Sequence, residues 1–471
     1  MRLEEAVAAV GGDIIFPDSY TEEMKSAALK TEICGAVTDN RKIEEGGIFV
    51  PVVGARVDGH SFMGAAYEAG ALACFNEQEP KEMDGIQIMV DSTLEALKRL
   101  AAAYRRTLTI PIVGIVGSVG KTSTKEMVAS VLSQKFNTLK TEGNLNNEIG
   151  LPLTIMSIRP GHKAAVVEMG ISDFGEMDRL GMMAEPNVVV MTNIGQCHME
   201  FLHDRDGILN AKTEVFDHLA GNALLVLNGD DDKLSIIAHG QPAGSNHRVP
   251  DDAVIAFFGM EKGDAYASDI RDNGLNGIEA LLHVRDKEIP VNIPIPGLHN
   301  VANALAACLV ADSLGLNADE MRAGVNTSST ISGRSNLIRK NGITIMDDCY
   351  NASPTSMKAS LKVLSSAEGR RIAVLGDMGE LGEHEADMHY DVGKTLATLD
   401  IDMLYTCGEL SKEIVRGALD HSDGNGLVAA HFDSMDELIA ALKKEIKKGD
   451  TILVKASHFM NYSKVVKALE A

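Results

Sequence analysis

The chain has 471 residues and a formal net charge of −23. This length exceeds what one hydrophobic core usually serves and predicts about three domains. The charge argues against a nucleic-acid partner, so any polyanionic ligand must be bound by local features: glycine-turn amides, a few Lys and Arg side chains, and divalent metal.

The N-terminus and the cysteines indicate a cytoplasmic protein. The first residues, MRLEEAVAAVGGD, are acidic where a signal peptide needs basic residues. No apolar run approaches the roughly 20 residues of a membrane span, so no membrane insertion is expected. The six cysteines are widely spaced and form no C-x-x-C pair, which is typical of buried thiols in a reduced compartment.

Residues 1–107 form a small mixed α/β block that ends in the helix STLEALKRLAAAYRR, opened by an expected capping box from Ser92 to Glu95. Earlier in this block, VTDNRKIEEGGIFVPVVGARVDGHSF contains two polar turns. Turns with Asx-type hydrogen bonds would explain them without a ligand, and for Asp39 alone this interpretation is favoured. The candidate binding residues of the two turns are Thr38, Asp39, Arg41, Gly54, Arg56, Asp58 and His60.

Two larger blocks follow. Residues 108–331 carry the apolar strands TIPIVGIVG, AAVVEM, NVVVMTN and ALLVLNG, and they close with a turn that leads into the helix of IPIPGLHNVANALAACLVADSLG. Residues 332–471 alternate strand and helix patterns, which predicts a doubly wound sheet. The expected fold is therefore α/β with three domains: a small mixed N-terminal domain, a central P-loop-type ATPase domain with a mainly parallel sheet, and a C-terminal Rossmann-like domain.

The stretch PIVGIVGSVGKTSTKEM predicts a phosphate-binding turn between a strand and a helix. The strict P-loop pattern fails, because Ile115 stands where it needs glycine. A compressed form is present, with Gly117, Ser118, Gly120, Lys121, Thr122 and Ser123 as candidates for binding a nucleotide. The turn could also merely join strand to helix, and it does not by itself separate a GTPase, a motor or a kinase from a synthetase.

Three further candidates stand at strand ends or on a helix. Glu168 ends a buried strand, His198 follows another strand, and Lys212 lies in a helical pattern. Taken singly, they would be a solvated carboxylate, a loop histidine and a surface lysine. The asparagine-rich segment TEGNLNNEIGLPLT (141–154) is too polar for a core element and joins this group.

In this order, the blocks GSVGKTSTKEM, TEGNLNNEIGLPLT, TNIGQCHMEFL, GLHNVANALAA and MDDCYNASPTSMKASL resemble the Mur ligase family, which builds the peptide stem of peptidoglycan. The resemblance covers essentially the whole chain. The DDCYNASP and VLGDMGELGEHE blocks are most similar to the member that joins D-Ala-D-Ala to UDP-MurNAc-tripeptide. This implies that ATP phosphorylates a carboxylate and that the dipeptide amine then attacks the acyl phosphate.

The resemblance also implies roles for the candidate residues. The phosphate loop would hold ATP, Lys121, Lys212 and His198 would be catalytic, and the two turns of the first block would bind the UDP-sugar. Two Mg²⁺ ions are expected, with Thr122, Glu168, His198 and a carbamylated Lys212 as ligands. Asn300, Asn303, Arg334 and Asp348 would complete the ATP site, and Tyr350, Asn351 and Pro354 would shape the dipeptide side. A monomer is expected.

Relatives tend to read Lys-Gly-Ser-Arg near the C-terminus, whereas this chain has Lys455, Ala456, Ser457 and His458. Three alternatives stay open: a Mur ligase that adds a single amino acid, a folylpolyglutamate-type ligase, and a non-catalytic nucleotide-binding sensor of wall precursors. The first block argues against the folate type, which lacks a sugar-nucleotide domain. Loss of Lys121, Glu168 or Lys212 would favour the sensor, and all three are present.

Overall fold

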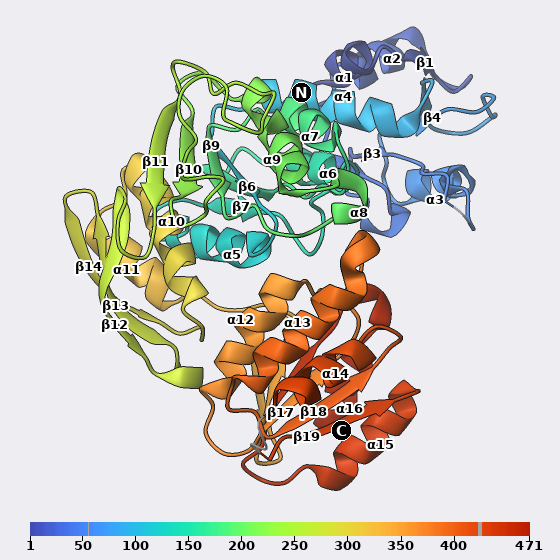
Figure 1. Cartoon of the computed structure of the whole chain (residues 1–471). Coiled ribbons are helices and arrows are strands. Elements are labelled where there is room, and N and C mark those ends of the chain that lie inside the picture. Colours follow the sequence, from blue (N-terminus) through green and yellow to red (C-terminus); the bar gives the residue numbers. More distant parts are fainter. Residues whose placement is uncertain (55, 423–425) are drawn as a thin grey trace.

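The computed structural model describes residues 1–54, 56–422 and 426–471, which form three sheets with their own helices (Figure 1). The three sheets follow one another along the chain, as the strand patterns predict. Among the described residues, none of the helices is both long and apolar enough to cross a bilayer.

The first sheet has the strand order β1-β5-β4-β3-β2, with β1 antiparallel to β5 and the other pairs parallel. Its strands are β1 (Asp13–Ile15), β2 (Ala36–Val37), β3 (Ile48–Phe49), β4 (Ala73–Asn76) and β5 (Ile86–Met89), and its helices are α1 (Leu3–Val10), α2 (Glu22–Leu29), α3 (Met63–Glu68) and α4 (Thr93–Thr107). The hydroxyl of Ser92 accepts the Glu95 amide and starts α4. The Glu95 carboxylate turns to Lys98 at 2.8 Å instead of completing the expected capping box.

The central sheet has nine strands in the order β14-β13-β12-β11-β10-β9-β6-β8-β7. It is parallel from β7 (Thr138–Lys140) to β12, through β8 (Ala164–Glu168), β6 (Ile112–Val116), β9 (Val188–Met191), β10 (Leu224–Asn228) and β11 (Val254–Phe258). The strands β12 (Ala265–Asp272), β13 (Ile278–Val284) and β14 (Lys287–Ile293) add an antiparallel meander that the sequence reading did not predict.

Helices cover both faces of the central sheet (Figure 1). They are α5 (Lys121–Leu132), α6 (Gly150–Met156), α7 (Glu176–Ala184), α8 (Met199–Leu202), α9 (Arg205–Thr213), α10 (His299–Ser313) and α11 (Ala318–Asn326). One apolar cluster joins the α4, α6, α7 and α9 side to the first domain. The other lies under α5, α10 and α11. The sheet is therefore fixed on both sides, and its strand ends are held in place.

The C-terminal sheet has the order β15-β16-β20-β17-β18-β19, parallel except for β15 at one edge. Its strands are β15 (Asn336–Lys340), β16 (Ile343–Asp347), β17 (Arg371–Leu375), β18 (Met403–Cys407), β19 (Val428–Phe432) and β20 (Thr451–Lys455), and its helices are α12 (Pro354–Ser365), α13 (Glu385–Ala397), α14 (Lys412–His421), α15 (Met435–Glu445) and α16 (Ser463–Glu470). Separate apolar clusters on its two faces confirm the predicted doubly wound domain.

The C-terminal domain lies against the central one. A Cβ on Gly195, beside the phosphate loop, would lie 3.9 Å from the hydroxyl of Thr355 in the first turn of α12. Leu275 of the central domain packs against the apolar cluster under α12 and α13. The two domains therefore share one boundary, and the strand ends of the central sheet face it.

Candidate active site

The glycine turn has the geometry of a phosphate loop. It joins β6 to α5, and Gly117 and Gly120 have positive φ angles of 147° and 86°. A side chain at Gly117 would also collide with the hydroxyl of Thr192, 2.0 Å from the added carbon. The loop therefore needs glycine at both positions. Its backbone amides lie at the N-terminus of α5, where an anion is favoured.

Lys121 opens α5 and folds its amine back over this loop. The Nζ atom donates to the carbonyl oxygens of Gly117 at 2.9 Å and Ser118 at 3.3 Å. Thr122 is buried and Ser123 is partly buried beside it. The structure therefore gathers the predicted phosphate-binding residues around one turn.

Glu168 lies at the buried carboxyl end of β8, next to β6. Its Oε1 accepts a hydrogen bond from the Asn146 side chain at 2.8 Å, and its backbone amide donates to the hydroxyl of Thr141 at 3.0 Å. Its Oε2 is buried and has no hydrogen-bond partner within the described chain. A buried carboxylate oxygen left free in this way suits a metal ligand.

Lys125 is a residue that the sequence reading missed. Its side chain is 1% exposed, donates to the Thr141 carbonyl at 2.7 Å, and lies 3.1 Å from Glu126 and 3.9 Å from Glu168. The lysine brings a positive charge to the buried carboxylate and ties α5 to the asparagine-rich segment. Its position on the inner face of α5 was the only available signal, and an apolar residue would fit the same pattern.

Lys212 is completely buried in the last turn of α9. Its Nζ has no hydrogen-bond partner among the residues that the structure describes. Burial lowers the pKa of this amine to about 8, with smaller effects of Cys197, which raises the pKa, and of the Lys121 charge, which lowers it. A lysine without a partner at this depth is not a surface charge, so the ordinary interpretation of this helix position is wrong.

His198 lies in the loop after β9, with a positive φ of 54°, and precedes α8. Its Nδ1 lies 2.5 Å from an oxygen of Glu380 in the C-terminal domain, although off the direction of a hydrogen bond. This pairing lowers the pKa of Glu380. The contact brings the His198 loop to the domain boundary.

No three His, Cys, Asp or Glu side chains converge as in a metal site made by protein alone, across the described ranges. A Mg²⁺ ion usually takes one or two protein ligands and completes its shell with phosphate oxygens and water. The free oxygen of Glu168 fits that pattern. Whether His198 and Thr122 join the same ion stays a prediction.

Asn300 and Asn303 lie in the first turns of α10 and connect it to α5. The hydroxyl of Thr124 donates to Asn303 at 2.9 Å, Asn303 donates to Asn300 at 2.9 Å, and Asn300 donates to the Pro296 carbonyl at 2.9 Å. Helix capping does not explain this series of hydrogen bonds, since they do not bind the first backbone amides of α10. The series places the side-chain amides of Asn300 and Asn303 beside the helix that carries Lys121.

Asp348 follows β16 in the C-terminal domain. Its carboxylate accepts from the Ser335 amide at 3.0 Å and, on the other oxygen, from Lys455 and Ser360, each at 2.6 Å. Lys455 belongs to the segment that departs from its relatives, and it is buried. Asp348 therefore organises the turn that carries Arg334.

Arg334 and Tyr350 stack on each other, with the guanidinium carbon 4.1 Å from the ring centroid. The ring of His458, where relatives tend to have arginine, lies 5.3 Å from the ring of Tyr350. Asn351 and Pro354 follow in the loop and first turn of α12, and the Asn351 carbonyl accepts from Lys455 at 3.1 Å. The predicted dipeptide-side residues therefore adjoin the predicted nucleotide residues.

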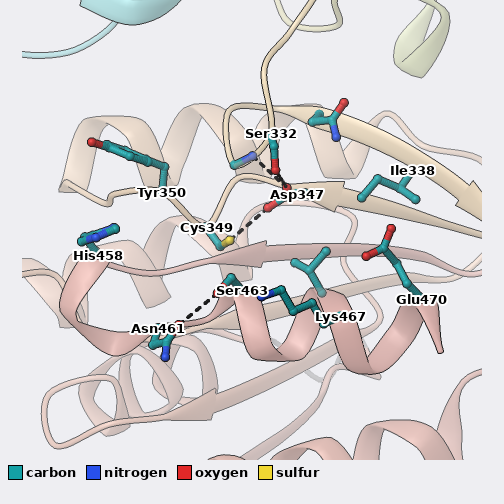
Figure 2. Close-up of a pocket in the computed structure, with 13 residues that line it drawn as sticks. Ser332, Ile338, Asp347, Cys349, Tyr350, His458, Asn461, Ser463, Lys467 and Glu470 are labelled. Carbon is teal, nitrogen blue, oxygen red and sulfur yellow. Dashed lines mark hydrogen bonds between the residues drawn. The ribbon is translucent and has the colours of Figure 1, made fainter. Parts of the chain in front are cut away.

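A cavity of about 410 Å³ opens beside Tyr350 and His458 (Figure 2). Strands β15 and β16 line one side, and α16 with the preceding turn lines the other. Its residues are Ser332, Gly333, Asn336, Ile338, Asp347, Cys349, Tyr350, His458, Asn461, Ser463, Val466, Lys467 and Glu470. Its volume lies within the usual range of small-molecule sites.

The two polar turns of the first domain are short 3-10 helices. Asp39 precedes the first (Asn40–Lys42), accepts the Arg41 amide at 3.1 Å and pairs with the Arg41 side chain at 2.8 Å. These bonds lower the pKa of Asp39 to about 2. Thr38 and Arg41 thus lie at a turn closed by Asx-type bonds, as the ligand-free interpretation expects.

Asp58 precedes the second 3-10 helix (Gly59–Phe62) and holds buried His60 through its amide at 2.9 Å and its ring at 2.7 Å. The same carboxylate accepts from Gln78, and these bonds lower the pKa of Asp58 to about 2. Asp58 and His60 therefore shape the loop, whereas Arg56 and Gly54 at its tip are exposed.

The comparisons with known proteins agree with this arrangement. The family descriptions that match are "Mur ligase family, catalytic domain" over residues 32–105, "Mur ligase middle domain" over 115–311, and "Mur ligase, glutamate ligase domain" over 333–458. Together these three matches take in most of the chain.

One relative is the UDP-N-acetylmuramoyl-tripeptide–D-alanyl-D-alanine ligase of Bacillus subtilis, 37% identical over 93% of this chain and 94% of its own length. A crystal structure of MurF from Acinetobacter baumannii is similar, with a TM-score of 0.85 and 30% identity over 100% of this chain and 98% of that one. The MurF ligase of Thermotoga maritima, solved in complex with ADP, has a TM-score of 0.79 and 31% identity over 93% and 97%. The three family domains match in the same order, the identity of 37% extends over nearly the whole chain, and the three-domain fold is shared. These findings show that the chain belongs to the Mur ligase family.

Proposed function

We propose that this chain is the ATP-dependent ligase that joins D-Ala-D-Ala to UDP-MurNAc-tripeptide in peptidoglycan precursor synthesis. The products are UDP-MurNAc-pentapeptide, ADP and phosphate. The near full-length similarity to a ligase of that name supports the choice of substrates. The structural observation that carries the proposal is the burial of two groups that have no hydrogen-bond partner among the described residues: Lys212 Nζ, and Glu168 Oε2, which has Lys125 Nζ at 3.9 Å.

The first step is transfer of the ATP γ-phosphoryl group to the tripeptide carboxylate. The glycine-turn amides hold the β- and γ-phosphates, and Lys121 places a positive charge beside the group in transfer. In the structure its amine rests on two loop carbonyls, 2.9 and 3.3 Å away. A phosphate would offer the amine a charged partner in place of these carbonyls.

The second step is attack of the dipeptide amine on the acyl phosphate. The new C–N bond forms, the C–O bond to phosphate breaks, and the proton that the amine loses leaves on the released phosphate. His198 lies at the domain boundary, where the carboxylate of one substrate and the amine of the other must meet. We assign it to this step.

Mg²⁺, when bound, would neutralise phosphate charge and polarise the phosphoryl oxygens. Glu168 would hold one ion with Thr122 and His198. A second ion needs another oxygen ligand, which Lys212 can supply as a carbamate. Its amine, neutral after loss of a proton, adds to CO₂ to give N–COO⁻ and releases a second proton; the low pKa caused by burial favours the neutral amine.

The flanking domains supply the rest of the site. Asn300 and Asn303 would hold the adenine side, with Arg334 and Asp348 completing the ATP site across the boundary. Tyr350, Asn351 and Pro354 would shape the dipeptide side, beside the cavity of about 410 Å³. The turns at Arg41 and Arg56 would hold the UDP end. All three domains of one chain contribute, so the proposed site needs no second subunit. We propose a monomer in the cytoplasm.

The test is phosphate release from ATP with each substrate alone and with both together. Full release should need both UDP-MurNAc-tripeptide and D-Ala-D-Ala, and the pentapeptide product should be identified by mass. Release with a single amino acid in place of the dipeptide would favour a sibling ligase. ATP binding without release under any combination would favour the sensor. Assaying L-lysine and meso-diaminopimelate tripeptides side by side would define the third residue.

A further inference from the structure

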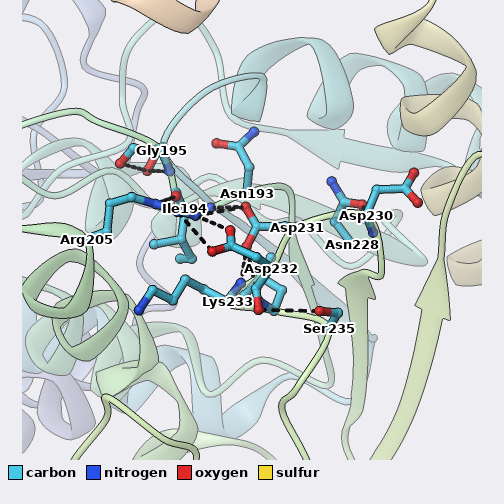
Figure 3. Close-up of polar contacts among 12 residues, drawn as sticks. Asn193, Ile194, Gly195, Arg205, Asn228, Asp230, Asp231, Asp232, Lys233 and Ser235 are labelled. Atoms are coloured by element: carbon cyan, nitrogen blue, oxygen red, sulfur yellow. Dashed lines mark hydrogen bonds and ion pairs between the residues drawn. The ribbon is translucent and has the colours of Figure 1, made fainter.

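Both backbone polar groups of Ile194, its N–H and its C=O, are held by side chains (Figure 3). The Ile194 amide donates to Asp231 Oδ2 at 2.9 Å, and the Ile194 carbonyl accepts from Arg205 Nε at 2.8 Å. Ile194 itself is fully buried in the loop between β9 and α8. Two charged residues from separate elements thus fix the two peptide groups that flank Ile194.

The residues on either side of Ile194 hold the phosphate loop. The Asn193 side chain accepts the Val119 amide at 3.0 Å and donates to the Val119 carbonyl at 2.9 Å. The Gly195 amide donates to the Ser118 hydroxyl at 2.9 Å. Val119 and Ser118 lie between the two glycines of the turn. The position of the backbone from Asn193 to Gly195 therefore sets the position of the loop.

Asp231 is itself rigidly placed. Its other oxygen accepts the amides of Lys233 and Leu234, each at 3.0 Å, within the turn after β10. In the same turn, the Asn228 side chain donates to the Thr192 carbonyl at 2.8 Å. The turn NGDDDK (228–233) therefore bonds to two residues of the segment after β9, Thr192 and Ile194.

Arg205 links the backbone of Ile194 to the helix that carries Lys212. It is the first residue of α9, and Lys212 lies in the last turn of that helix. The Arg205 guanidinium also pairs with both oxygens of Asp232, one of them at 3.0 Å. Its bond to the Ile194 carbonyl ties the start of α9 to the residues that support the phosphate loop.

We propose that Arg205 and Asp231 are positioning residues for ATP: they hold the backbone of Ile194, whose neighbours Asn193 and Gly195 hold the phosphate loop, and Arg205 fixes the start of α9 to the same backbone. This inference rests on the proposed function. Neither residue belongs to the loop that holds the phosphates, so they act through backbone geometry. Displacements of about 1 Å at such sites can lower turnover on the order of a hundredfold.

Two variants test the proposal. Arg205→Lys keeps a positive charge near Asp232 but loses the Nε donor to Ile194. Asp231→Asn removes the charge and places an amide group against backbone donors. Asp232→Asn is the matched control, because it lies in the same turn, makes the same chemical change and leaves both bonds to Ile194. In the Arg205–Asp232 pair the Asp232 side chain is 67% exposed, so loss of the pair should matter little.

We expect Arg205→Lys and Asp231→Asn each to weaken Mg²⁺·ADP binding and raise the KM for ATP about tenfold. The KM for D-Ala-D-Ala should stay within about twofold, and hydrogen exchange at the Ile194 and Gly195 amides should quicken. The Asp232→Asn variant should behave as the unmodified protein. Faster exchange with unchanged ADP affinity would overturn the proposal, as would equal effects of Asp231→Asn and Asp232→Asn or a parallel shift of all constants. Failure of the unmodified protein to bind ADP would instead overturn the proposed function.

Discussion

The phosphate-loop region and the first-domain turns both await charged ligands, but they are built differently. In the central domain, Lys212, Lys125 and Glu168 are buried. Glu168 is hydrogen-bonded to the side chains of an asparagine and a threonine. In the first domain, the Arg41 side chain is 83% exposed and pairs with Asp39 beside it. The central groups were removed from water during folding, whereas Arg41 keeps its hydration until a ligand arrives.

This difference teaches where each region contributes. Groups already held in a water-poor site act on the transition state without reorganising, so losing one should lower turnover. An exposed arginine contributes to binding only, and solvent weakens that contribution. The predictions below test this division, from the largest expected effect to the smallest.

Lys212→Ala should lower turnover roughly a thousandfold, since it removes the group assigned to a metal ion that supplies several kcal/mol of charge stabilisation. Added bicarbonate should not restore activity, because no amine remains to be carbamylated. Formate or acetate should restore part of it by placing a carboxylate in the gap. Near-normal turnover in a folded variant would remove Lys212 from the mechanism.

Lys121→Ala should lower turnover at least about a hundredfold, because it removes the positive charge beside the transferring phosphoryl group. Turnover is measured at saturating substrates, with circular dichroism as the check of folding. Lys135→Ala is the control, because Lys135 is an exposed lysine in the turn that follows α5. An unimpaired Lys121→Ala enzyme would contradict the phosphate-loop assignment.

The activity of CO₂-depleted enzyme should fall below pH 8. The pKa of Lys212 is lowered to about 8, so the amine is neutral above that pH and protonated below it, and only the neutral amine adds CO₂. At limiting CO₂ the neutral fraction falls about tenfold per pH unit. Saturating bicarbonate should flatten the profile. Identical profiles with and without bicarbonate would argue against a carbamate.

Arg41→Ala should raise the KM for UDP-MurNAc-tripeptide only severalfold, about the scale of one solvent-exposed ionic contact. The KM for D-Ala-D-Ala and the turnover should stay nearly unchanged, since the UDP end lies far from the amine. Arg2→Ala, another exposed arginine of this domain, is the control. A joint rise of both Michaelis constants would contradict the separation between the two regions.

The sequence predicted the elements whose pattern is local. The strand before Gly117, the strand that ends at Glu168 and the helix of Lys212 all lie where periodicity put them. The meander β12–β14 was not predicted, although its pairing is local. β13 and β14 alternate buried and more exposed residues, and Val284 pairs with Lys287 across a two-residue turn, so the signal was present in the sequence and was missed.

The site was only partly predictable. Glycines and Lys121 carry their chemistry in their spacing. Burial of Lys212 and Lys125 depends on neighbours far along the chain. The periodicity of apolar residues in a helix does not reveal that a lysine side chain is buried. The contact between His198 and Glu380 joins two domains, and nothing local announces it.

The central claim is amide formation through an acyl phosphate, and isotope transfer tests it most directly. UDP-MurNAc-tripeptide labelled with ¹⁸O in the carboxyl group of its third residue is turned over with ATP and D-Ala-D-Ala. Because a carboxylate oxygen attacks phosphorus and stays with it when the amine displaces phosphate, each released phosphate should carry one oxygen from the labelled carboxyl. Phosphate released without the label, while pentapeptide accumulates, would contradict the account.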